Sequence, residues 1–168
     1  LAWQAGLGWI GRSSCLIVPG VGPNVVLATL VTDAELSPDA PAAGDCGDCH
    51  RCVQACPTGA IGEGMVDARR CLSAHTTSSK KPIPEELLDA LQGRVFGCST
   101  CVAVCPHTVF DAGPAQPDPL PDVLLFQLDR RSFARELGHT ALSFIGKTAL
   151  LLHAVQALEK EAPTPASE

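Results

Sequence analysis

The sequence predicts an α+β chain with a cysteine-rich middle, a glycine- and strand-containing part before it, and helices after it. Eight of the nine cysteines lie between residues 46 and 106. Before them, the β-branched run "VVLATLV" at Val25–Val31 predicts a buried strand. After them, "RRSFARELG" and "ALSFIGKTALLLHAVQALEK" predict two helices. The apolar face of the second suggests the start of a HEAT-like helical repeat.

Composition sets the expected boundaries between these parts. Within the cysteine-rich part, Met65–His75 and Pro84–Gly93 predict helices, the second because proline suits the first helical turn and glycine suits the end. A proline-rich connector follows at Ala112–Asp122, and the end of the chain predicts a frayed tail. The expected segments are 1–43, 44–111, 112–122, 123–160 and 161–168.

The stretch "GLGWIG", Gly6–Gly11, has the G-x-G-x-x-G pattern of a dinucleotide-binding loop. That pattern needs a strand before it and a helix after it, but few residues precede it, and Pro19 and Pro23 interrupt the expected helix. Asp33 or Glu35 could serve as the acidic partner, although acidic residues are common. The sequence therefore favours a tight glycine loop over NAD or FAD binding.

The balance of charges excludes some partners. The chain has 12 basic and 18 acidic residues, giving a formal net charge of −6, and its basic residues form no tract. Because nucleic-acid affinity comes mainly from neutralised phosphates, this chain alone is not expected to bind nucleic acid strongly. No apolar run approaches the ~20 residues of a membrane span, and no signal-peptide pattern is present. We expect a cytoplasmic monomer without membrane contact.

Two cysteine runs predict a pair of iron–sulfur clusters. The first, "CGDCHRCVQACP", has the ferredoxin spacing C-x2-C-x2-C-x3-C-P, in which the fourth cysteine binds the other cluster. The second run, "CSTCVAVCP", lacks the middle cysteine, and the cysteine between the runs supplies the missing ligand. The first cluster is assigned to Cys46, Cys49, Cys52 and Cys105. The second cluster is assigned to Cys98, Cys101, Cys71 and Cys56.

Other uses of the cysteines fit the spacing less well. Zinc sites use paired C-x2-C knuckles with longer gaps, and an odd number of closely spaced cysteines without a secretory signal disfavours disulfides. Cys15 is left over and is expected to be a small buried residue. His50 and His107 neighbour cluster cysteines and could donate hydrogen bonds to sulfur, the alternative being ordinary surface histidines.

Six blocks in order through residues 5–106 resemble the epoxyqueuosine reductase family. They are "AGLGWIGRSSCLIVPG", a strand followed by "TDAELSPDAP", "CGDCHRCVQACPTGAI", "DARRCLS", "KPIPEEL" and "RVFGCSTCVAVCP". The resemblance implies a cobalamin-dependent enzyme of queuosine-tRNA maturation, in which electrons pass through two 4Fe-4S clusters to cobalamin. The epoxide-bearing ring of the modified base then loses water to leave an alkene, with a carboxylic acid supplying the proton.

The resemblance also implies where each function lies. Residues 1–43 form the edge of an α/β cobalamin-binding domain, whose glycine segment shapes backbone near the corrin. Residues 44–111 form a ferredoxin-like domain with both clusters. Cobalamin contacts carry over to Ser73, Cys98, Ser99, Ser14 and Val25. The family's proton-donor aspartate is expected upstream of Leu1, so this chain is expected to be a C-terminal part that is inactive alone. Expected partners are tRNA carrying epoxyqueuosine and an electron donor of flavodoxin or ferredoxin type.

The sequence also departs from the family pattern. Position 99, often acidic in the family, is a serine, and Ile145, Leu152 and His153 stand where the C-terminal helices of the family carry basic or polar residues. These changes weaken the expected tRNA contact of the tail. The alternatives are an iron–sulfur electron-transfer protein that serves a partner enzyme, or a related cobalamin and iron–sulfur reductase such as a reductive dehalogenase.

Overall fold

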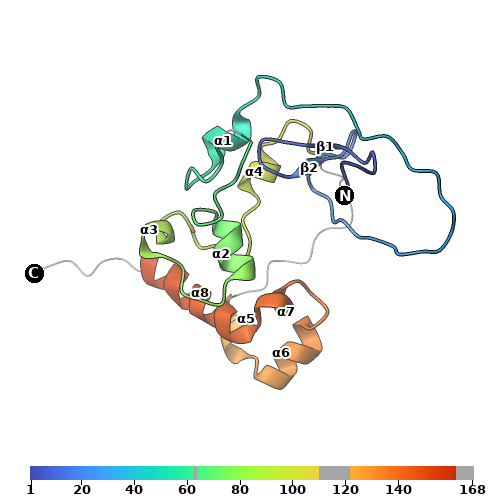
Figure 1. Cartoon of the computed structure of the whole chain (residues 1–168). Coiled ribbons are helices and arrows are strands. Elements are labelled where there is room, and N and C mark those ends of the chain that lie inside the picture. The colour runs from blue at the N-terminus through green and yellow to red at the C-terminus, as the bar shows by residue number, and fades with distance from the viewer. Residues whose placement is uncertain (63, 110–121, 162–168) are drawn as a thin grey trace, which may run out of the picture. The chain divides into compact units, whose positions relative to one another are not determined.

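The computed structural model describes residues 1–62, 64–109 and 122–161, which separate into two compact units (Figure 1). Unit 1 comprises Leu1–Asp67 and Ser99–Ala112, and unit 2 comprises Ala68–Cys98 and Gly113–Glu168. Each unit is therefore built from two separated stretches of chain. The segment boundaries expected from composition stay predictions, and the proline-rich connector and the tail lie almost entirely outside the described residues.

Unit 1 consists of short elements joined by loops. Strand β1 (Trp9–Ile10) pairs antiparallel with β2 (Leu16–Ile17) to form a hairpin. Helix α1 (Arg51–Ala55) packs against α4 (Thr100–Ala103). The helices bring the two cysteine runs together, because each run contains one of them.

The strand predicted at Val25–Val31 is wrong. This segment has no secondary structure and belongs to the long loop that runs from the hairpin to the first cysteine run (Figure 1). Val26 and Val31 are 98% and 91% exposed. A strand needs a neighbour to pair its backbone groups, and within the described residues the only sheet is the one formed by β1 and β2. The β-branched residues give this segment a high strand propensity, but no neighbouring strand pairs with it in the described part of the chain.

Unit 2 is helical. Its helices are α2 (Leu72–Ser78), α3 (Glu85–Leu88), α5 (Asp122–Gln127), α6 (Arg130–Leu137), α7 (Leu142–Ile145) and α8 (Lys147–Glu161). One cluster of buried side chains includes Val95, Leu125, Leu128, Phe133, Leu137, Ile145, Ala149, Leu150 and Ala154. A second includes Leu72, Ile83, Leu87, Leu91 and Ala157. Helix α8 contributes to both clusters, so it is the central element of unit 2.

Two of the predicted helices are shorter than expected. The helix expected at Met65–His75 begins only at Leu72, because the preceding chain folds back: the Asp67 N–H donates to the Ala60 carbonyl at 2.8 Å. The helix expected at Pro84–Gly93 ends as α3 at Leu88 and continues as turns. Local composition therefore located both helices but not their ends.

The C-terminal prediction is confirmed in one part and wrong in another. The helix "RRSFARELG" is α6, where Asp129 caps the start by accepting a 2.7 Å hydrogen bond from the Ser132 N–H. The long helix expected after it is two helices, α7 and α8. Gly146 separates them with a φ of 80°, which favours glycine.

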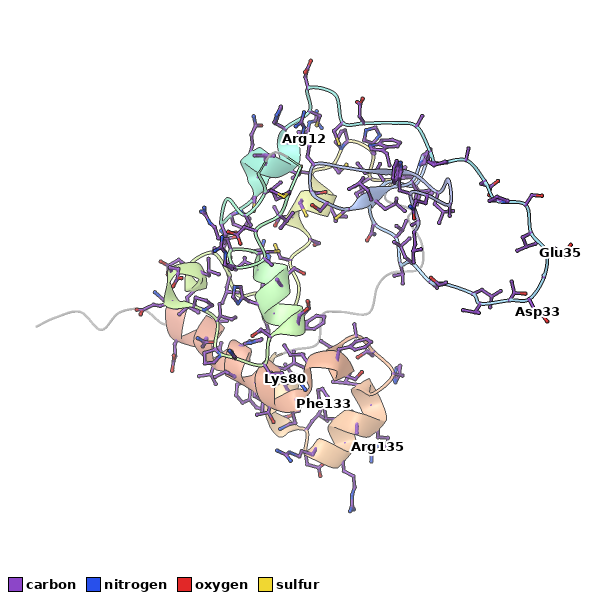
Figure 2. All side chains as sticks on the ribbon, in the orientation of Figure 1. Arg12, Asp33, Glu35, Lys80, Phe133 and Arg135 are labelled. Atoms are coloured by element: carbon purple, nitrogen blue, oxygen red, sulfur yellow. The ribbon has the colours of Figure 1, made fainter. Side chains whose placement is uncertain are left out.

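The positions that depart from the family pattern at the end of the chain are packing positions. Ile145 and His153 are buried, with 3% and 0% of their surface exposed, and Leu152 is half-buried. Phe133 likewise points into the core, while Arg135 on the same helix is exposed (Figure 2). In the described ranges, no helix has both the length and the apolar character needed to span a membrane.

Candidate iron–sulfur centre

The two cysteine runs begin their helices in the same way. His50 precedes α1 with φ −122° and ψ 17°, and Ser99 precedes α4 with φ −110° and ψ 12°. Each capping residue directly follows a cysteine, and each helix carries the next cysteine of its run, Cys52 or Cys101. The repeated C-x2-C spacing thus has a repeated backbone conformation.

The runs also end in the same way, at a cysteine followed by proline. After the first run, the Gly59 N–H donates to the Cys56 carbonyl at 3.1 Å; after the second, the Thr108 N–H donates to the Cys105 carbonyl at 3.0 Å. Proline disfavours the helical conformation in the residue before it, so both helices stop before the final cysteine. Each final cysteine is therefore set apart from the helix that precedes it.

One cavity in unit 1 gathers cysteines from both runs. It is partly open and lies beside the contact between α1 and α4. Its cysteine lining consists of Cys46, Cys49, Cys52, Cys101 and Cys105. All four cysteines assigned to the first cluster therefore line one cavity, together with one assigned to the second.

The cysteines line this cavity without converging on a point. Among the described residues, no group of three or more His, Cys, Asp or Glu side chains is placed to hold a single metal ion. A 4Fe-4S cluster binds its four cysteines through different iron atoms, so its ligands are spread over the walls of a cavity. The donor set of four thiols fits such a cluster.

The cysteine thiols differ in their surroundings. Burial raises the pKa of Cys52, and the nearby Cys46 and Cys49 raise it further. Burial also acts to raise the pKa of Cys56, but hydrogen bonds from Thr58 and from backbone N–H groups outweigh it and lower the pKa. One of these is the Ala60 N–H, which lies 3.3 Å from the Cys56 sulfur. Backbone N–H groups already point at this sulfur, as they do around cluster ligands.

The cysteines assigned to the second cluster are divided between the units. Cys56 and Cys101 belong to unit 1, and Cys71 and Cys98 belong to unit 2. Their assignment to one cluster stays a prediction. The first cluster is different, because its cysteines all lie within unit 1.

The glycine segment lies beside the first cysteine run, in unit 1. A Cβ on Gly8 would clash with the Ile17 carbonyl oxygen, and a Cβ on Gly11 would lie 2.6 Å from the Ile17 side chain and 3.4 Å from the Cys46 sulfur. These glycines therefore permit close packing of the hairpin and close approach to a cluster cysteine. Whether the segment also lies near a corrin stays a prediction.

The surroundings of the glycine segment agree with the expectation against dinucleotide binding. A turn and β2 follow Gly11 where a dinucleotide-binding loop would continue into a helix. Asp33 and Glu35 are exposed at the outer bend of the long loop (Figure 2). The glycine pattern in this chain thus has a structural use that does not require a nucleotide.

The two histidines near the cysteines have different roles. His50 is exposed, and its Nδ1 donates to the Asp48 carbonyl at 2.9 Å. His107 lines the cavity, and its ring meets Trp9 edge to face with centroids 5.2 Å apart. His107 therefore lies beside the cysteines, as a hydrogen bond to sulfur would require. His50 instead uses one ring nitrogen to bond the backbone of its own loop.

Two features near the cysteines were missed in the sequence. Cys15 is half-buried rather than fully buried, and a hydrogen bond with Cys101 lowers its pKa to about 6. Arg12 lines the cysteine cavity, and its Nη2 donates to the Gly47 carbonyl at 2.7 Å (Figure 2). In the sequence, both residues lie in the block "AGLGWIGRSSCLIVPG" that resembles the family. That resemblance suggested that the block lies near the corrin and gave no indication of contact with the cysteines.

The residues expected to contact cobalamin are also divided. Ser14, Val25 and Ser99 belong to unit 1, and Ser73 and Cys98 belong to unit 2. Ser14 is exposed in the hairpin turn with a φ of 59°, Ser99 is exposed before α4, and the others are half-buried. Whether these residues share one corrin site stays a prediction.

The comparisons with known proteins identify the class first. Residues 45–108 match the family described as the 4Fe-4S double cluster binding domain. The match supports iron–sulfur clusters in this part of the chain, which contains both cysteine runs and α1 to α4.

The same comparisons then identify the relatives of the whole chain. The epoxyqueuosine reductase of Listeria monocytogenes is 36% identical over 164 residues, which is 92% of this chain and 43% of that protein. The structure of the epoxyqueuosine reductase from Streptococcus thermophilus matches with a TM-score of 0.80 at 35% identity, covering 94% of this chain and 44% of that one. The chain is therefore homologous to the epoxyqueuosine reductases, as the sequence predicts.

A further solved relative is an epoxyqueuosine reductase in complex with an epoxyqueuosine-modified tRNA-Tyr stem loop. It matches with a TM-score of 0.80 at 33% identity, covering 94% of this chain and 44% of that one. The chain spans less than half the length of these relatives.

Proposed function

We propose that this chain is the electron-supplying part of an enzyme that reduces epoxyqueuosine in tRNA to queuosine. The observation that carries the proposal is the cavity in unit 1, which is lined by Cys46, Cys49, Cys52 and Cys105. The names of the homologous proteins support the reaction, and the tRNA stem loop bound to one relative supports the substrate. The protein is then a cytoplasmic oxidoreductase.

The chemistry requires such a part. Converting an epoxide to an alkene with loss of water consumes two electrons and two protons, and an iron–sulfur cluster transfers one electron at a time. The first cluster is held by Cys46, Cys49, Cys52 and Cys105, which are four of the five cysteines of the cavity. Cys56, Cys71, Cys98 and Cys101 hold the second cluster. An electron donor of flavodoxin or ferredoxin type reduces the pair.

Cobalamin, when bound, supplies the low-potential chemistry at the epoxide carbon. The residues of this chain proposed to contact it are Ser73, Cys98, Ser99, Ser14 and Val25. The residues of unit 1 around the cavity hold the sulfur ligands of the first cluster, since α1, α4 and the hairpin contribute to its walls. The proton donor is an aspartate in another part of the enzyme, so this chain alone is inactive.

The first experiment measures cofactor binding by the whole protein, reconstituted with iron and sulfide without oxygen. Titration with cob(II)alamin, followed by the cobalt EPR signal, should give a changed and saturable spectrum. An unchanged cobalt spectrum in protein with both clusters intact would remove the cobalamin enzyme and leave an iron–sulfur electron carrier.

The second experiment measures the reaction on an epoxyqueuosine-containing tRNA stem loop by mass spectrometry. The expected product has lost one oxygen atom, and Cys46→Ser should reduce its formation by at least tenfold because the first cluster loses a ligand. Cys15→Ser is the matched control, because Cys15 is a neighbouring cysteine outside the proposed ligand set. Full activity of the Cys46 variant would contradict the electron path.

A further inference from the structure

We propose that Arg12 raises the reduction potential of the first cluster by presenting a buried N–H group and a positive charge to it. This inference rests on the proposed function, because it takes Cys46, Cys49, Cys52 and Cys105 as the ligands of that cluster. It assigns a role to a residue that binds no iron.

Arg12 is held against the ligand loop from outside the cysteine runs. It follows Gly11 in the turn between β1 and β2, and its side chain is half-buried. The Nη2 atom donates to the carbonyl of Gly47, between Cys46 and Cys49, at 2.7 Å. One end of the guanidinium is therefore fixed on the loop that supplies two of the cluster ligands.

The other side of the guanidinium lacks a partner. The Nε atom of Arg12 is buried and makes no hydrogen bond within the described residues, and Arg12 lines the cavity that the cysteines line. Buried N–H groups are nearly always hydrogen-bonded, so an unpartnered one at a cavity indicates an acceptor that occupies the cavity. Sulfide and thiolate sulfurs are acceptors of this kind in iron–sulfur proteins.

A second buried donor shows what is particular to Arg12. Trp9 Nε1 is also buried without a partner in the described part of the chain, but Trp9 does not line the cysteine cavity and carries no charge. Arg12 combines the unpartnered N–H, a fixed position beside the ligand loop and a permanent positive charge.

The charge of Arg12 is not paired with the carboxylates of its own surroundings. Asp45 and Asp48 on the ligand loop are exposed, and Asp45 accepts a 2.7 Å hydrogen bond from the Gly47 N–H. Within the described residues, no ion pair involves Arg12. Asp45 and Asp48 line a second, open pocket together with Arg12, where solvent screens their charges, so the positive charge of Arg12 is available to the thiolates of the cysteine cavity.

The direction of the effect follows from electrostatics. Reducing the cluster adds one negative charge, and a fixed cation nearby favours the more negative state. Hydrogen bonds to the sulfurs act in the same direction, because they stabilise electron density on sulfur. Arg12 thus makes the first cluster easier to reduce by the electron donor.

The test is an anaerobic redox titration, followed by EPR, of the whole reconstituted protein and its Arg12→Gln variant. We expect one of the two reduction waves to move to lower potential and the other to stay. At a fixed potential, the reduced-to-oxidised ratio of the affected cluster should fall at least tenfold, which corresponds to about 59 mV for one electron. The variant must retain the wild-type iron content.

Arg51→Gln is the matched control. Arg51 is the other arginine that lines the cavity, but it is exposed on α1, where solvent screens its charge. We expect a clearly smaller shift for this variant. An iron-replete Arg12→Gln protein with unchanged potentials would overturn the proposal, and so would equal shifts in the two variants.

A spectroscopic measurement covers the case in which Arg12→Gln does not assemble its clusters. In wild-type protein labelled with ¹⁵N-arginine, pulsed EPR of the reduced protein should show a nitrogen coupling to a cluster. The coupling should persist in Arg51→Gln protein labelled in the same way. Its absence from the wild type would overturn the inference, whereas a wild type without any 4Fe-4S signal would remove the proposed function itself.

Discussion

Unit 1 and unit 2 differ in how much apolar surface they bury. In unit 2, two clusters of buried side chains surround α8, and Leu91 and Leu150 are at most 1% exposed. In the described part of unit 1, the buried hydrophobic side chains are those of Leu16, Ile17, Ala60 and Ile61. Burying a large aliphatic side chain contributes about 1.5–3 kcal/mol, while ordering each residue of backbone costs about 1–2 kcal/mol.

The difference indicates that the two units depend on different sources of stability. Packing can stabilise unit 2, because both of its clusters of buried side chains include residues of α8. Unit 1 has short helices and a hairpin whose strands are two residues long each, so its apolar core is small for its length. Metal ligation contributes folding free energy wherever the site is ordered only in the folded state, and unit 1 gathers five cysteines around one cavity.

The largest expected effect is therefore the loss of unit 1 on removal of iron. After chelation under mild oxidation, hydrogen exchange should become fast throughout residues 1–62 and 99–109. Exchange should stay slow in α6 and α8, because their core contains no iron. Hydrogen exchange with mass spectrometry measures both regions in one sample. Equal loss of protection in both regions would show that the units depend on the clusters to the same extent.

A comparison of cysteine variants sharpens the same result without chelator. Cys49→Ser should lower iron content and protection in unit 1, since Cys49 lines the cavity. Cys15→Ser should retain iron, because Cys15 is not assigned to a cluster. A similar iron loss in both variants would mean that Cys15 takes part in ligation.

The second prediction concerns packing in unit 2. Leu150→Ala leaves a hole at a fully buried position of α8 and should lower the free energy of unfolding by about 2–5 kcal/mol. Leu158→Ala on the same helix is the control, because Leu158 is 45% exposed and should cost much less. Urea unfolding monitored by the helical circular dichroism signal measures both. Equal costs would contradict a core centred on α8.

The sequence alone predicts a set of candidate cluster ligands, because cluster chemistry requires fixed spacing. A cluster with four thiolate ligands needs cysteines at short intervals followed by a turn. The C-x2-C pattern supplies the short intervals, and the C-P pattern indicates the turn. The structure gives the two runs matching caps at His50 and Ser99. Helix α6 was predicted from its own sequence, and the structure adds a local cap at Asp129.

Features that depend on distant contacts could not be predicted. Val25–Val31 has the composition of a strand, but pairing depends on a neighbour that composition does not reveal. The break between α7 and α8 arises because Gly146 adopts a left-handed backbone conformation. The apolar pattern around it is helical on both sides and does not reveal this conformation. The position of Arg12 depends on the hairpin, which carries it to Gly47, 35 residues along the chain.

The smallest expected effect is a pH dependence confined to unit 2. His153 is fully buried on α8, its Nε2 donates to the Lys81 carbonyl at 3.2 Å, and its Nδ1 has no partner within the described residues. Burial lowers the pKa of His153 below 6.5; the hydrogen bond to Lys81 opposes this, and the charge of His75 adds to it. His153 is therefore neutral in the folded protein near pH 7.

The sign of the pH dependence follows from this shift. Below pH 6.5 the unfolded chain binds a proton at His153 more readily than the folded protein does, so the free energy of unfolding falls as the pH decreases. Above pH 6.5 the contribution is complete. His153→Gln keeps an N–H donor for the Lys81 carbonyl but cannot titrate, so its stability should fall less steeply from pH 6.5 toward about pH 5.

The control for this prediction is His139→Gln, since His139 is exposed and its substitution should leave the slope unchanged. Urea unfolding at several pH values, followed by the helical signal, gives the slope for each protein. Acid also weakens iron–sulfur ligation, because thiolates become protonated, but that change is the same in all three proteins. A steeper loss in wild type than in His153→Gln, with the His139 variant matching wild type, therefore reports on the core of unit 2. If all three slopes coincide, the buried histidine does not control the acid sensitivity of unit 2, and titration at its surface must be responsible.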